Sequence, residues 1–324
     1  MLMYVARRLI YSIPVLVVSS FLIFTFVASS TDPLEAVRMR PNVNQQAILL
    51  IEKEKHLKDP MVVRYGYWVK DVLTNDFGTG VLDDRPILPD LERVLKNTLQ
   101  LIVAAEILSI LIGCGIGILS AIRQYSWFDH SATTFSFLGA AVPVFWLALS
   151  LQILFTTLFV KFHVRIFYTS GLNSVNPGHG LHFVIDRAQH LALPVIVLSV
   201  ANMTLYTRFM RTAMLDVFGS DFIRTARAKG LREVRVIGRH VLRNALIPIT
   251  TLVAINFGAL FGGAVITETI FALDGMGRYF INALNGGDPY PIMAWLLVTS
   301  TVVILFNLVA DLLLGLLDPR IRLD

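Results

Sequence analysis

The sequence predicts an all-α polytopic membrane protein with six transmembrane helices. Of its 324 residues, 55% are hydrophobic and only 16% are charged. Apolar runs of about twenty residues recur, and each is long enough to cross a hydrocarbon core of about 30 Å as a helix. The charges lie between these runs, whereas a soluble domain would intersperse them along amphipathic elements. The pattern therefore excludes the soluble globular class.

The spans follow the apolar runs in order along the chain. The first run comes directly after Arg7 and Arg8, and it exceeds the roughly 7–15 apolar residues of a secretory signal, which favours an uncleaved span. The second contains the single cysteine, Cys114, so no internal disulfide is possible. A polar segment, 31–97, follows the first span. The predicted spans are 9–30, 98–122, 132–160, 190–212, 246–270 and 291–317.

Lysine and arginine mark one side of the membrane. The net charge is +5, and most of the excess lies in loops beside the spans, as is typical of cytoplasmic loops. With six spans, the basic N-terminus, the 123–131 loop, the strongly basic stretch 208–243 and the tail share one side. Both termini are therefore predicted to be cytoplasmic and segment 31–97 extracytoplasmic. This distribution also argues against a nucleic-acid surface.

The most informative stretch is "DFIRTARAKGLREVRVIGRHVLRNALIP", residues 221–248. Ser220 can cap a short helix that has Asp221 in its first turn, and Gly230 can adopt the positive φ of a sharp helix–helix turn. After this turn, two helical faces are predicted. The apolar face carries Leu231, Val234, Gly238, Val241 and Ala245, and the basic face carries Arg232, Arg235, Arg239 and Arg243. Three interpretations fit: a helix lying on anionic lipid, a positive-inside anchor, and a docking element for a cytoplasmic partner.

Several polar side chains fall inside the predicted spans, where such groups are costly and often functional. Glu106 is either a buried partner of a basic group or a pathway charge. The candidates are Glu106, Gln152, Asn202, Asn256, Thr267, Glu268, Asn307 and Asp311. Asn307 and Asp311 are one turn apart and are interpreted as a pair that clamps helices or binds loop backbone, with lining of the pathway as the alternative. In the second span, Gly113, Gly115 and Gly117 are predicted to allow close helix packing.

Four histidines lie in or beside the predicted outer loop 161–189: His163, His179, His182 and His190. A helical "HGLH" could hold a metal ion with its two imidazoles. The surrounding "NPGHGLH" is broken by glycine and proline, which favours a solvated loop. A metal site remains the alternative.

The loop and several other stretches resemble ABC importer permeases. "TARAKG", followed by a basic helix and then "ALIP", resembles the EAA loop of that family; Thr225-Ala226-Arg227 stands where Glu-Ala-Ala would be, which is usual for the peptide subgroup. The resemblance extends to nearly the whole chain except 31–97 and 161–189. Its other motifs are "MLMYVARRLIYSIPVLVVSSFLIFTF", "NTLQLIVAAEILSILIGCGIGILSAI", "VPVFWLALSLQILF", "GGAVITETIFALDGMGRYFINAL" and "NLVADLLLGLLDPRIR".

By this resemblance the chain is identified as a B-type permease subunit of a bacterial oligopeptide, dipeptide or nickel ABC importer. The resemblance implies the type I importer permease fold, in the cytoplasmic membrane, with an extracytoplasmic insert after the first helix. Residues 1–97 would form the first helix and this insert. Residues 98–318 would form the permease core with a coupling loop at about 216–245, and 319–324 a cytoplasmic tail.

The resemblance also implies how the loop works: it would dock on a separate ATPase and move when ATP closes the ATPase pair. Phe222, Ala226, Ala228 and Leu231 would make contact, and the arginines would provide charge complementarity. The coupling residues would be Asp221, Phe222, Thr225, Ala226, Arg227, Ala228, Lys229, Gly230, Leu231 and Arg235. Asn256 and Glu268, in the span that lines the path in this family, and Glu106 would contribute to translocation.

The chain lacks a GxxxxGK[ST] phosphate loop, so ATP and Mg²⁺ are expected on the partner ATPase. No catalytic residue, metal or cofactor is expected on this chain. The expected partners are a paralogous second permease subunit, one fused or two separate ATPases, an extracytoplasmic substrate-binding protein and membrane lipid.

Three rival functions remain. Import of nickel or another metal complex is an alternative to import of oligopeptides or dipeptides. A stand-alone secondary transporter usually has a two-fold repeat, which is not evident. A membrane-embedded enzyme would need a motif such as HExxH or GxSxG, and neither occurs.

Overall fold

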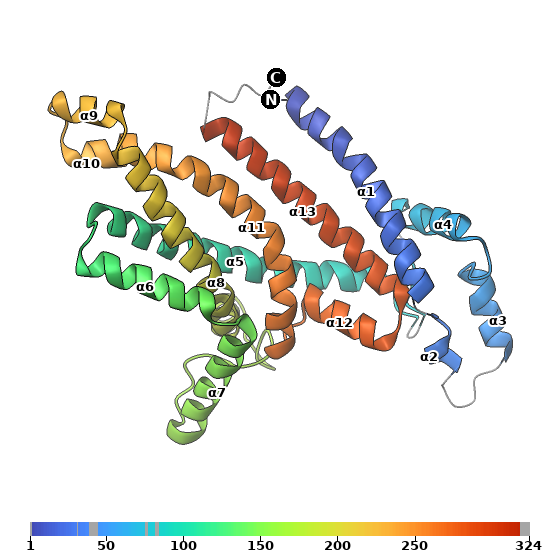
Figure 1. Cartoon of the computed structure of the whole chain (residues 1–324). Helices are drawn as coiled ribbons and strands as arrows, with labels where there is room; N and C mark the ends of the chain where they lie inside the picture. Colours follow the sequence, from blue (N-terminus) through green and yellow to red (C-terminus); the bar gives the residue numbers. More distant parts are fainter. Residues whose placement is uncertain (1, 31, 39–44, 75–76, 82–83, 318–324) are drawn as a thin grey trace. The chain divides into compact units, whose positions relative to one another are not determined.

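A computed structural model of the chain describes residues 2–30, 32–38, 45–74, 77–81 and 84–317 (Figure 1). Helices form nearly all the regular structure in these ranges, beside an isolated β-bridge between Thr79 and Pro86. The helices are α1 (Leu2–Ser30), α2 (Glu35–Arg38), α3 (Gln45–Glu54), α4 (Met61–Leu73), α5 (Ile87–Ile122), α6 (Trp127–Ala141), α7 (Val144–Phe162), α8 (Leu181–Phe218), α9 (Asp221–Ala228), α10 (Glu233–Arg235), the π-helix η1 (Val236–Val241), α11 (Leu242–Ile270), α12 (Met276–Gly286) and α13 (Pro289–Leu317).

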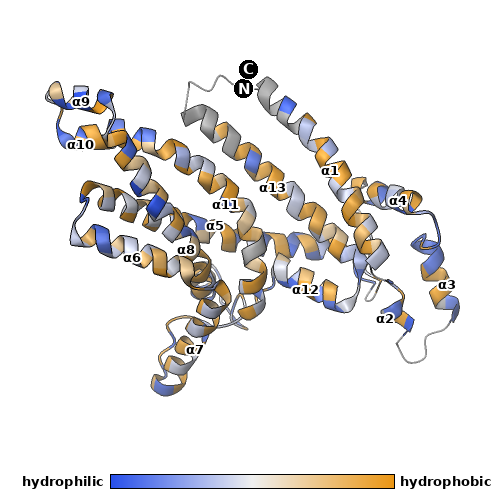
Figure 2. Ribbon diagram, viewed as in Figure 1, coloured by the Kyte–Doolittle hydropathy of each residue, from blue (hydrophilic) through white to orange (hydrophobic). Residues whose placement is uncertain are grey.

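The prediction of an all-α protein with six membrane-spanning helices is confirmed. Six helices in the described ranges are long and apolar enough to cross a bilayer. Hydrophobic residues predominate along α1 and α13 (Figure 2), and many large apolar side chains are exposed, as expected of surfaces that face lipid or another subunit. The segments are Ile10–Ser30, Ile87–Ile122, Val144–Phe162, Leu181–Phe218, Glu233–Phe261 and Pro289–Val309.

The predicted third span, 132–160, is corrected by the structure. It is divided into α6, which ends at Ala141, and α7, which begins at Val144. Val142 has extended backbone angles, φ −76° and ψ 119°, as favoured by Pro143, which disfavours the α conformation for the residue before it. The break lies inside an otherwise apolar run, so hydropathy alone did not reveal it.

The second and fourth spans also begin earlier than predicted. Helix α5 starts at Ile87 rather than at residue 98, with Pro89 in its first turn, where the missing N–H costs nothing. Asp90 complements the positive helix end there. Helix α8 starts at Leu181 rather than at residue 190 and continues through Pro194. In both cases a polar helical segment precedes the apolar run.

The chain forms two compact units. Among the described residues, the α8–α11 unit comprises Leu99–Leu273 and those from Phe306 onward, and the α1–α4 unit comprises those of Leu2–Thr98 and Asp274–Leu305. The boundaries differ from the predicted domains 1–97, 98–318 and 319–324, which remain a prediction. The tail 319–324 lies outside the described residues.

Within the α8–α11 unit, α8 is the central helix, and α6, α7 and α11 pack against it. Gly113 and Gly117 of α5 allow close contact with α8: an added Cβ would lie 2.7 Å from the Met203 carbonyl oxygen or 2.6 Å from that of Thr207. Gly115 faces open space. The predicted close-packing role is therefore confirmed for the first and last of the three glycines only.

Within the α1–α4 unit, aromatic residues from α1 and α4 pack together. The Phe24 ring lies 5.6 Å from Tyr65 and 5.7 Å from Trp68, centroid to centroid. Ile292 and Met293 of α13 join the same buried cluster. This cluster fixes α4 against α1 and the start of α13.

Candidate functional site

The predicted helix–glycine–helix loop is present between α8 and α11, at the end of these helices that carries α9 and α10 (Figure 1). Gly230 has φ +74°. Its N–H donates to the Arg227 carbonyl at 2.9 Å, and the Leu231 N–H donates to the Ala226 carbonyl at 3.4 Å. These two hydrogen bonds define a Schellman motif, which requires the left-handed conformation that glycine adopts without strain. The predicted glycine turn is confirmed.

Ser220 occupies the predicted position before α9, but it does not cap the helix with its side chain. Its hydroxyl donates to the Val217 carbonyl at 2.6 Å. The last carbonyl groups of α8 also lack partners within their own helix, and the hydroxyl and the Ser220 N–H, the latter at 3.1 Å, both donate to that of Val217. The capping prediction was wrong because two helix ends compete for one serine.

Buried side chains fix the loop to the rest of the α8–α11 unit. Ile223 and Val236 are fully buried, and Ala226 is 8% exposed. They belong to one hydrophobic cluster with Met210 and Met214 of α8. Ala226, a predicted contact with the ATPase, therefore packs inside this chain, on the side of the loop that faces α8.

The other predicted coupling residues lie on the outside of the loop. Phe222 is 48% exposed, although phenylalanine is usually buried. Leu231 is half-buried. The exposed members are Asp221, Phe222, Thr225, Arg227, Ala228, Lys229, Gly230 and Arg235. The arrangement presents an aromatic side chain, the chain turn and several cations on one small element.

An ion pair connects the two arms of the turn. The Arg227 guanidinium donates to both carboxylate oxygens of Glu233, from Nη2 at 2.6 Å and from Nε at 3.2 Å. The guanidinium carbon also lies 5.7 Å from the Phe218 ring centroid. Arg227 therefore has a bracing role within the loop, in addition to its predicted contribution of charge.

The predicted apolar face after Gly230 is corrected by the π-helix η1. Val234, placed on that face, is 85% exposed, whereas Val236, Val241 and Ala245 are fully buried. A π-helix has i→i+5 hydrogen bonds, so Val236 and Val241 lie on the same side. The prediction assumed α-helical spacing throughout, and the wider turn shifts which valine faces inward.

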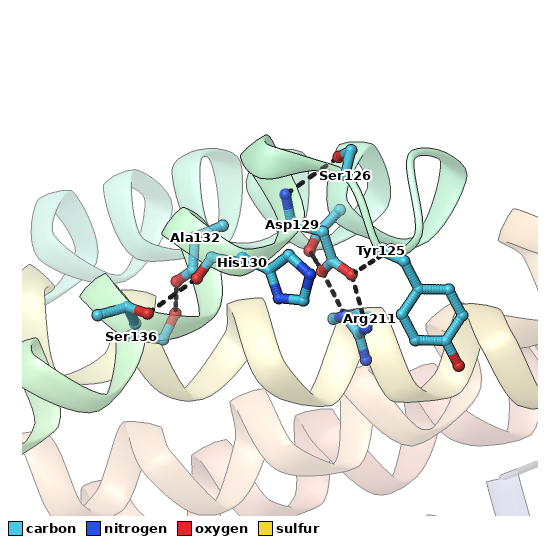
Figure 3. A network of polar contacts seen from close by, with 9 residues as sticks. Tyr125, Ser126, Asp129, His130, Ala132, Ser136 and Arg211 are labelled. Carbon is cyan, nitrogen blue, oxygen red and sulfur yellow. Dashed lines mark hydrogen bonds and ion pairs between the residues drawn. The ribbon is translucent and has the colours of Figure 1, made fainter.

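Near the predicted cytoplasmic 123–131 loop, Asp129 and Arg211 form a buried ion pair that the sequence did not reveal (Figure 3). Arg211 Nε and Nη2 lie 2.6 Å and 2.8 Å from the two carboxylate oxygens. Asp129 also accepts from the Ser120 hydroxyl and, at 2.9 Å, from the Tyr125 N–H. Arg211 holds the pKa of Asp129 well below its usual range, with help from these donors and against the effect of burial. The pair ties the start of α6 to α8.

Three of the predicted polar span residues meet in one cluster. Asn202 of α8 donates to Glu106 of α5 at 3.4 Å, and Asn256 of α11 donates to the Tyr206 hydroxyl at 3.4 Å. Tyr206 in turn donates to Glu106. Glu106 is 3% exposed and Tyr206 is fully buried, so the cluster joins α5, α8 and α11 within their unit.

Sequence reasoning missed Tyr206, although a signal existed. Tyr206 follows Asn202 by one helical turn, so both side chains lie on the same face of α8. A tyrosine hydroxyl inside an apolar span needs a hydrogen-bond partner, just as an asparagine amide does.

The remaining polar candidates occupy different places. Gln152 donates from Nε2 to the carbonyls of Thr169, at 2.9 Å, and Ile270, at 3.2 Å, and so ties the chain after α7 to the end of α11. Thr267 and Glu268 are buried near the same end. Asn307 is half-buried. The Asp311 side chain, its predicted clamp partner, lies outside the described residues.

The histidines in and beside the outer loop occupy different positions. His179 precedes α8 between two positive-φ glycines, and His182 lies in the first turn of that helix. His190 is buried, with Nδ1 2.8 Å from the Asp186 carbonyl and its ring stacked on Tyr168. Among the described residues, no group of three or more metal-ligating side chains is gathered in one place.

The sequence of this chain is similar to a known protein family and to several named proteins. Residues 113–323 match the family described as "Binding-protein-dependent transport system inner membrane component". The dipeptide transport system permease protein DppB of Alkalihalophilus pseudofirmus is 37% identical, covering 99% of this chain and 100% of that protein. The oligopeptide transport system permease protein AppB of Bacillus subtilis is also 37% identical, with 98% and 99% coverage. DppB of Escherichia coli is 34% identical, with 99% coverage of both.

Solved structures resemble the fold. An inward-facing structure of the MetNI methionine ABC transporter aligns with a TM-score of 0.56 and 16% identity, over 70% of this chain and 96% of that chain. This confirms the importer-permease fold that the resemblance predicted. The match to the family over most of the chain and the full-length relatives lead to one conclusion: the chain belongs to the family of binding-protein-dependent transport system inner membrane components.

Proposed function

We propose that this chain is the transmembrane subunit of an ATP-driven importer of oligopeptides or dipeptides, and that loop 216–245 couples it to a separate ATPase. The observation that carries the proposal is the loop itself. Its outer face exposes Phe222 and several cations, while its inner face is fixed by Ile223 and Val236 to the core shared by α8 and α11. A force applied to such an element is transmitted directly to two spans.

The substrate class rests on the relatives, which are permeases of dipeptide and oligopeptide systems. The importer assembles with a paralogous permease, with one fused or two separate ATPases, and with an extracytoplasmic binding protein. ATP and Mg²⁺ bind to the ATPase, and this chain itself performs no catalysis. The ATP-driven change shifts the population between inward- and outward-facing states.

The chain resides in the bacterial cytoplasmic membrane with both termini inside. The basic residues concentrated in the loop support this orientation. Helix α12 and the segment between α1 and α5 are then extracytoplasmic, where a binding protein delivers the substrate. Asn256, Glu268 and Glu106 remain our candidates for the translocation path; the burial of Glu106 and Glu268 means that substrate would reach them only after the helices move.

The test is a substitution at the turn. Gly230→Val forces a β-branched residue into the left-handed region, although an added Cβ would meet no atom within 4 Å. We expect membrane insertion to persist and substrate-dependent ATP hydrolysis by the reconstituted importer to be abolished. Gly230→Asn should retain coupling, because asparagine tolerates this conformation.

Gly180→Val is the matched control. Gly180 also has a positive φ, +60°, and open space around it, but it precedes α8 in the outer loop. Its ψ of −125° lies outside the left-handed helical region, so valine there is strained at least as strongly as at Gly230, but away from the proposed coupling loop. Normal substrate-stimulated hydrolysis in Gly230→Val, measured beside this control, would refute the coupling role.

A further inference from the structure

A small cavity lies at the end of α7, within the α8–α11 unit, in a part of the chain that the proposed coupling function does not use. Its volume is about 180 Å³, below the roughly 300–1,000 Å³ of sites that enclose a whole small molecule. The cavity therefore has room for one polar group of a larger molecule. The lining residues are Phe155, Thr156, Phe159, Arg165, Phe167, Tyr168, Thr169 and Ser170.

Arg165 is the charged residue of this lining, and two aromatic rings hold its guanidinium. The guanidinium carbon lies 4.1 Å from the Phe159 ring centroid and 5.0 Å from that of Tyr168, within the range of cation–π contacts. Within the part of the chain that the structure describes, the Arg165 side chain forms neither a hydrogen bond nor an ion pair. Its N–H donors are therefore available to an anion.

The acidic residue of the same loop has other partners. Residues 161–189 contain one carboxylate, Asp186. Its two oxygens accept from the Ser174 N–H at 2.9 Å and from the Ser174 hydroxyl at 2.5 Å, and His190 Nδ1 lies 3.6 Å from Oδ2. The positive charge of Arg165 is therefore not offset by the carboxylate of its own loop.

Three hydroxyl groups belong to the lining as well, from Thr156, Thr169 and Ser170. None of these hydroxyls makes a hydrogen bond to another described residue. Arginine, serine and threonine side chains are among those that bind the oxygens of phosphodiesters, and the guanidinium fork matches phosphate geometry. The lining therefore has the donors of a phosphate site.

Contacts with α8 and α11 fix this part of the chain. The Tyr168 ring is stacked on His190, with centroids 3.8 Å apart, and the Tyr168 N–H donates to the Gln189 carbonyl at 3.3 Å. The Gly171 N–H donates to the Phe271 carbonyl at 2.9 Å. A cavity whose walls are already ordered loses little conformational entropy when a ligand enters.

The surroundings of the cavity have the composition of a membrane interface. Helix α7 is apolar and long enough to span a bilayer, and it ends at Phe162. Phe162, Val164 and Ile166 are 67%, 53% and 47% exposed, and they alternate in the sequence with Lys161, His163 and Arg165. Cations near the end of a spanning helix reach the headgroup layer, and exposed apolar side chains beside them contact acyl chains.

We propose that this cavity binds a phosphate group, and that a phospholipid of the outer leaflet supplies it. Arg165 and the three hydroxyls bind the phosphate oxygens through charge-assisted hydrogen bonds, which are the strong ones. The acyl chains lie along the exposed apolar side chains of α7. The leaflet rests on the orientation given under the proposed function, whereas the phosphate site rests on the cavity itself.

The test uses the importer purified through this chain and delipidated in detergent. Native mass spectrometry measures the binding of phosphatidylglycerol and of a diacylglycerol with the same acyl chains, which lacks the phosphate. Phosphatidylglycerol should bind at least about tenfold more tightly, because hydrogen bonds to a charged group are lost in the diacylglycerol. This comparison needs no mutation, so it tests the site even if a variant fails to fold.

The variants Arg165→Gln and Thr156→Val should each weaken the binding of phosphatidylglycerol by about tenfold or more. Arg123→Gln is the matched control. Arg123 is also an exposed arginine directly after a spanning helix, α5, but it lies outside the cavity lining, so its variant should bind as the wild type does.

Four results would overturn the inference. Equal binding of phosphatidylglycerol and diacylglycerol would exclude a phosphate site. Inorganic phosphate that competes at the same concentration as the lipid would make free phosphate the ligand. Equal effects of Arg165→Gln and Arg123→Gln would mean a general attraction between cations and anionic lipid. Normal lipid binding by Arg165→Gln with loss of the second permease subunit would make the cavity a contact between subunits.

Peptide-stimulated ATP hydrolysis, measured on the same preparation after reconstitution, tests the proposed function separately. Lipid binding that depends on Arg165, without such hydrolysis, would leave the phosphate site standing and refute the importer. Stimulated hydrolysis without Arg165-dependent lipid binding would do the reverse.

Discussion

Asp129 and Arg211 show how a single pair of residues can define the packing of two helices. The Asp129 side chain is 2% exposed and that of Arg211 is 26% exposed, so solvent screens the pair weakly. Removing one partner of such a pair leaves an uncompensated charge, which is strongly destabilising. The pair therefore contributes to the stability of the α8–α11 unit.

We expect Asp129→Asn to lower the free energy of unfolding by roughly 3 kcal/mol, because Arg211 loses its carboxylate inside the protein. The measurement is denaturation of the purified subunit in detergent, followed by circular dichroism. Glu92→Gln is the control, since Glu92 pairs with Lys96 at 4.0 Å on an exposed surface and should change stability by less than about 1 kcal/mol. Equal effects of the two variants would contradict this account.

The same pair predicts a pH dependence. Arg211 lowers the pKa of Asp129 in the folded state, whereas the unfolded value is about 3.9. The stabilisation is therefore fully present above about pH 4 and is lost as the pH falls toward the folded pKa. Between about pH 5 and about pH 3 the wild type should lose more stability than Asp129→Asn, which has no carboxylate to protonate at this position.

At the scale of elements, α5 and α8 approach each other at two glycines. An alanine at Gly113 or Gly117 would place Cβ within 2.7 Å of a backbone oxygen of α8, and backbone cannot yield as a flexible side chain can. We expect Gly113→Ala and Gly117→Ala each to destabilise the unit by roughly 1–3 kcal/mol, the usual cost of overpacking. The midpoint of unfolding in detergent measures the effect.

Gly115→Ala separates packing from helix propensity. Gly115 lies on the same helix and has no atom within 4 Å of its ideal Cβ, so alanine should be neutral or stabilising by up to about 1 kcal/mol. If all three variants behaved alike, the close contact between α5 and α8 would be wrong.

The loop 216–245, which we propose couples to the ATPase, is a second case in which the geometry is a property of the whole element. Its turn, its Arg227–Glu233 brace and its π-helical continuation act as one piece between α8 and α11. A π-helix inside a helical segment is frequently found at functional sites. Here it places Val236 and Val241 inward together and turns Val234 outward.

At the scale of the whole molecule, several membrane-spanning helices expose large apolar side chains. Side chains of α1 such as Ile10, Leu22 and Phe26 are more than 60% exposed. In the apolar stretch of α7, only 6% of the residues are buried. In membrane proteins, such surfaces contact lipid or other membrane-spanning helices. Exposure of this kind supports the proposed assembly of the chain with other membrane subunits.

We expect affinity purification of this chain from native membranes in mild detergent to bring along a second six-span subunit and an ATPase with a phosphate loop. Mass spectrometry identifies both. A lone chain, or a homo-oligomer without an ATPase, would mean that the basic loop serves as a lipid anchor and that the importer proposal is wrong.

The sequence predicted the class, the six spans and the glycine turn because these features depend on local properties. An apolar run of sufficient length forms a spanning helix wherever it stands, and the turn at Gly230 needs only the φ that glycine adopts. The family motifs, including "TARAKG" and "ALIP", were equally readable, and the comparisons confirm the family.

The tertiary structure alone decided which side chains meet. Asp129 and Arg211, or Glu106 and Tyr206, lie far apart in the sequence and come together because α5, α6 and α8 pack in one unit. The exposed position of Val234 follows from a π-helix that α-helical periodicity does not predict. Periodicity describes one helix at a time, whereas burial and ion pairing depend on contacts between helices. The contacts that hold the loop and the polar clusters in place could therefore be identified only in the folded chain.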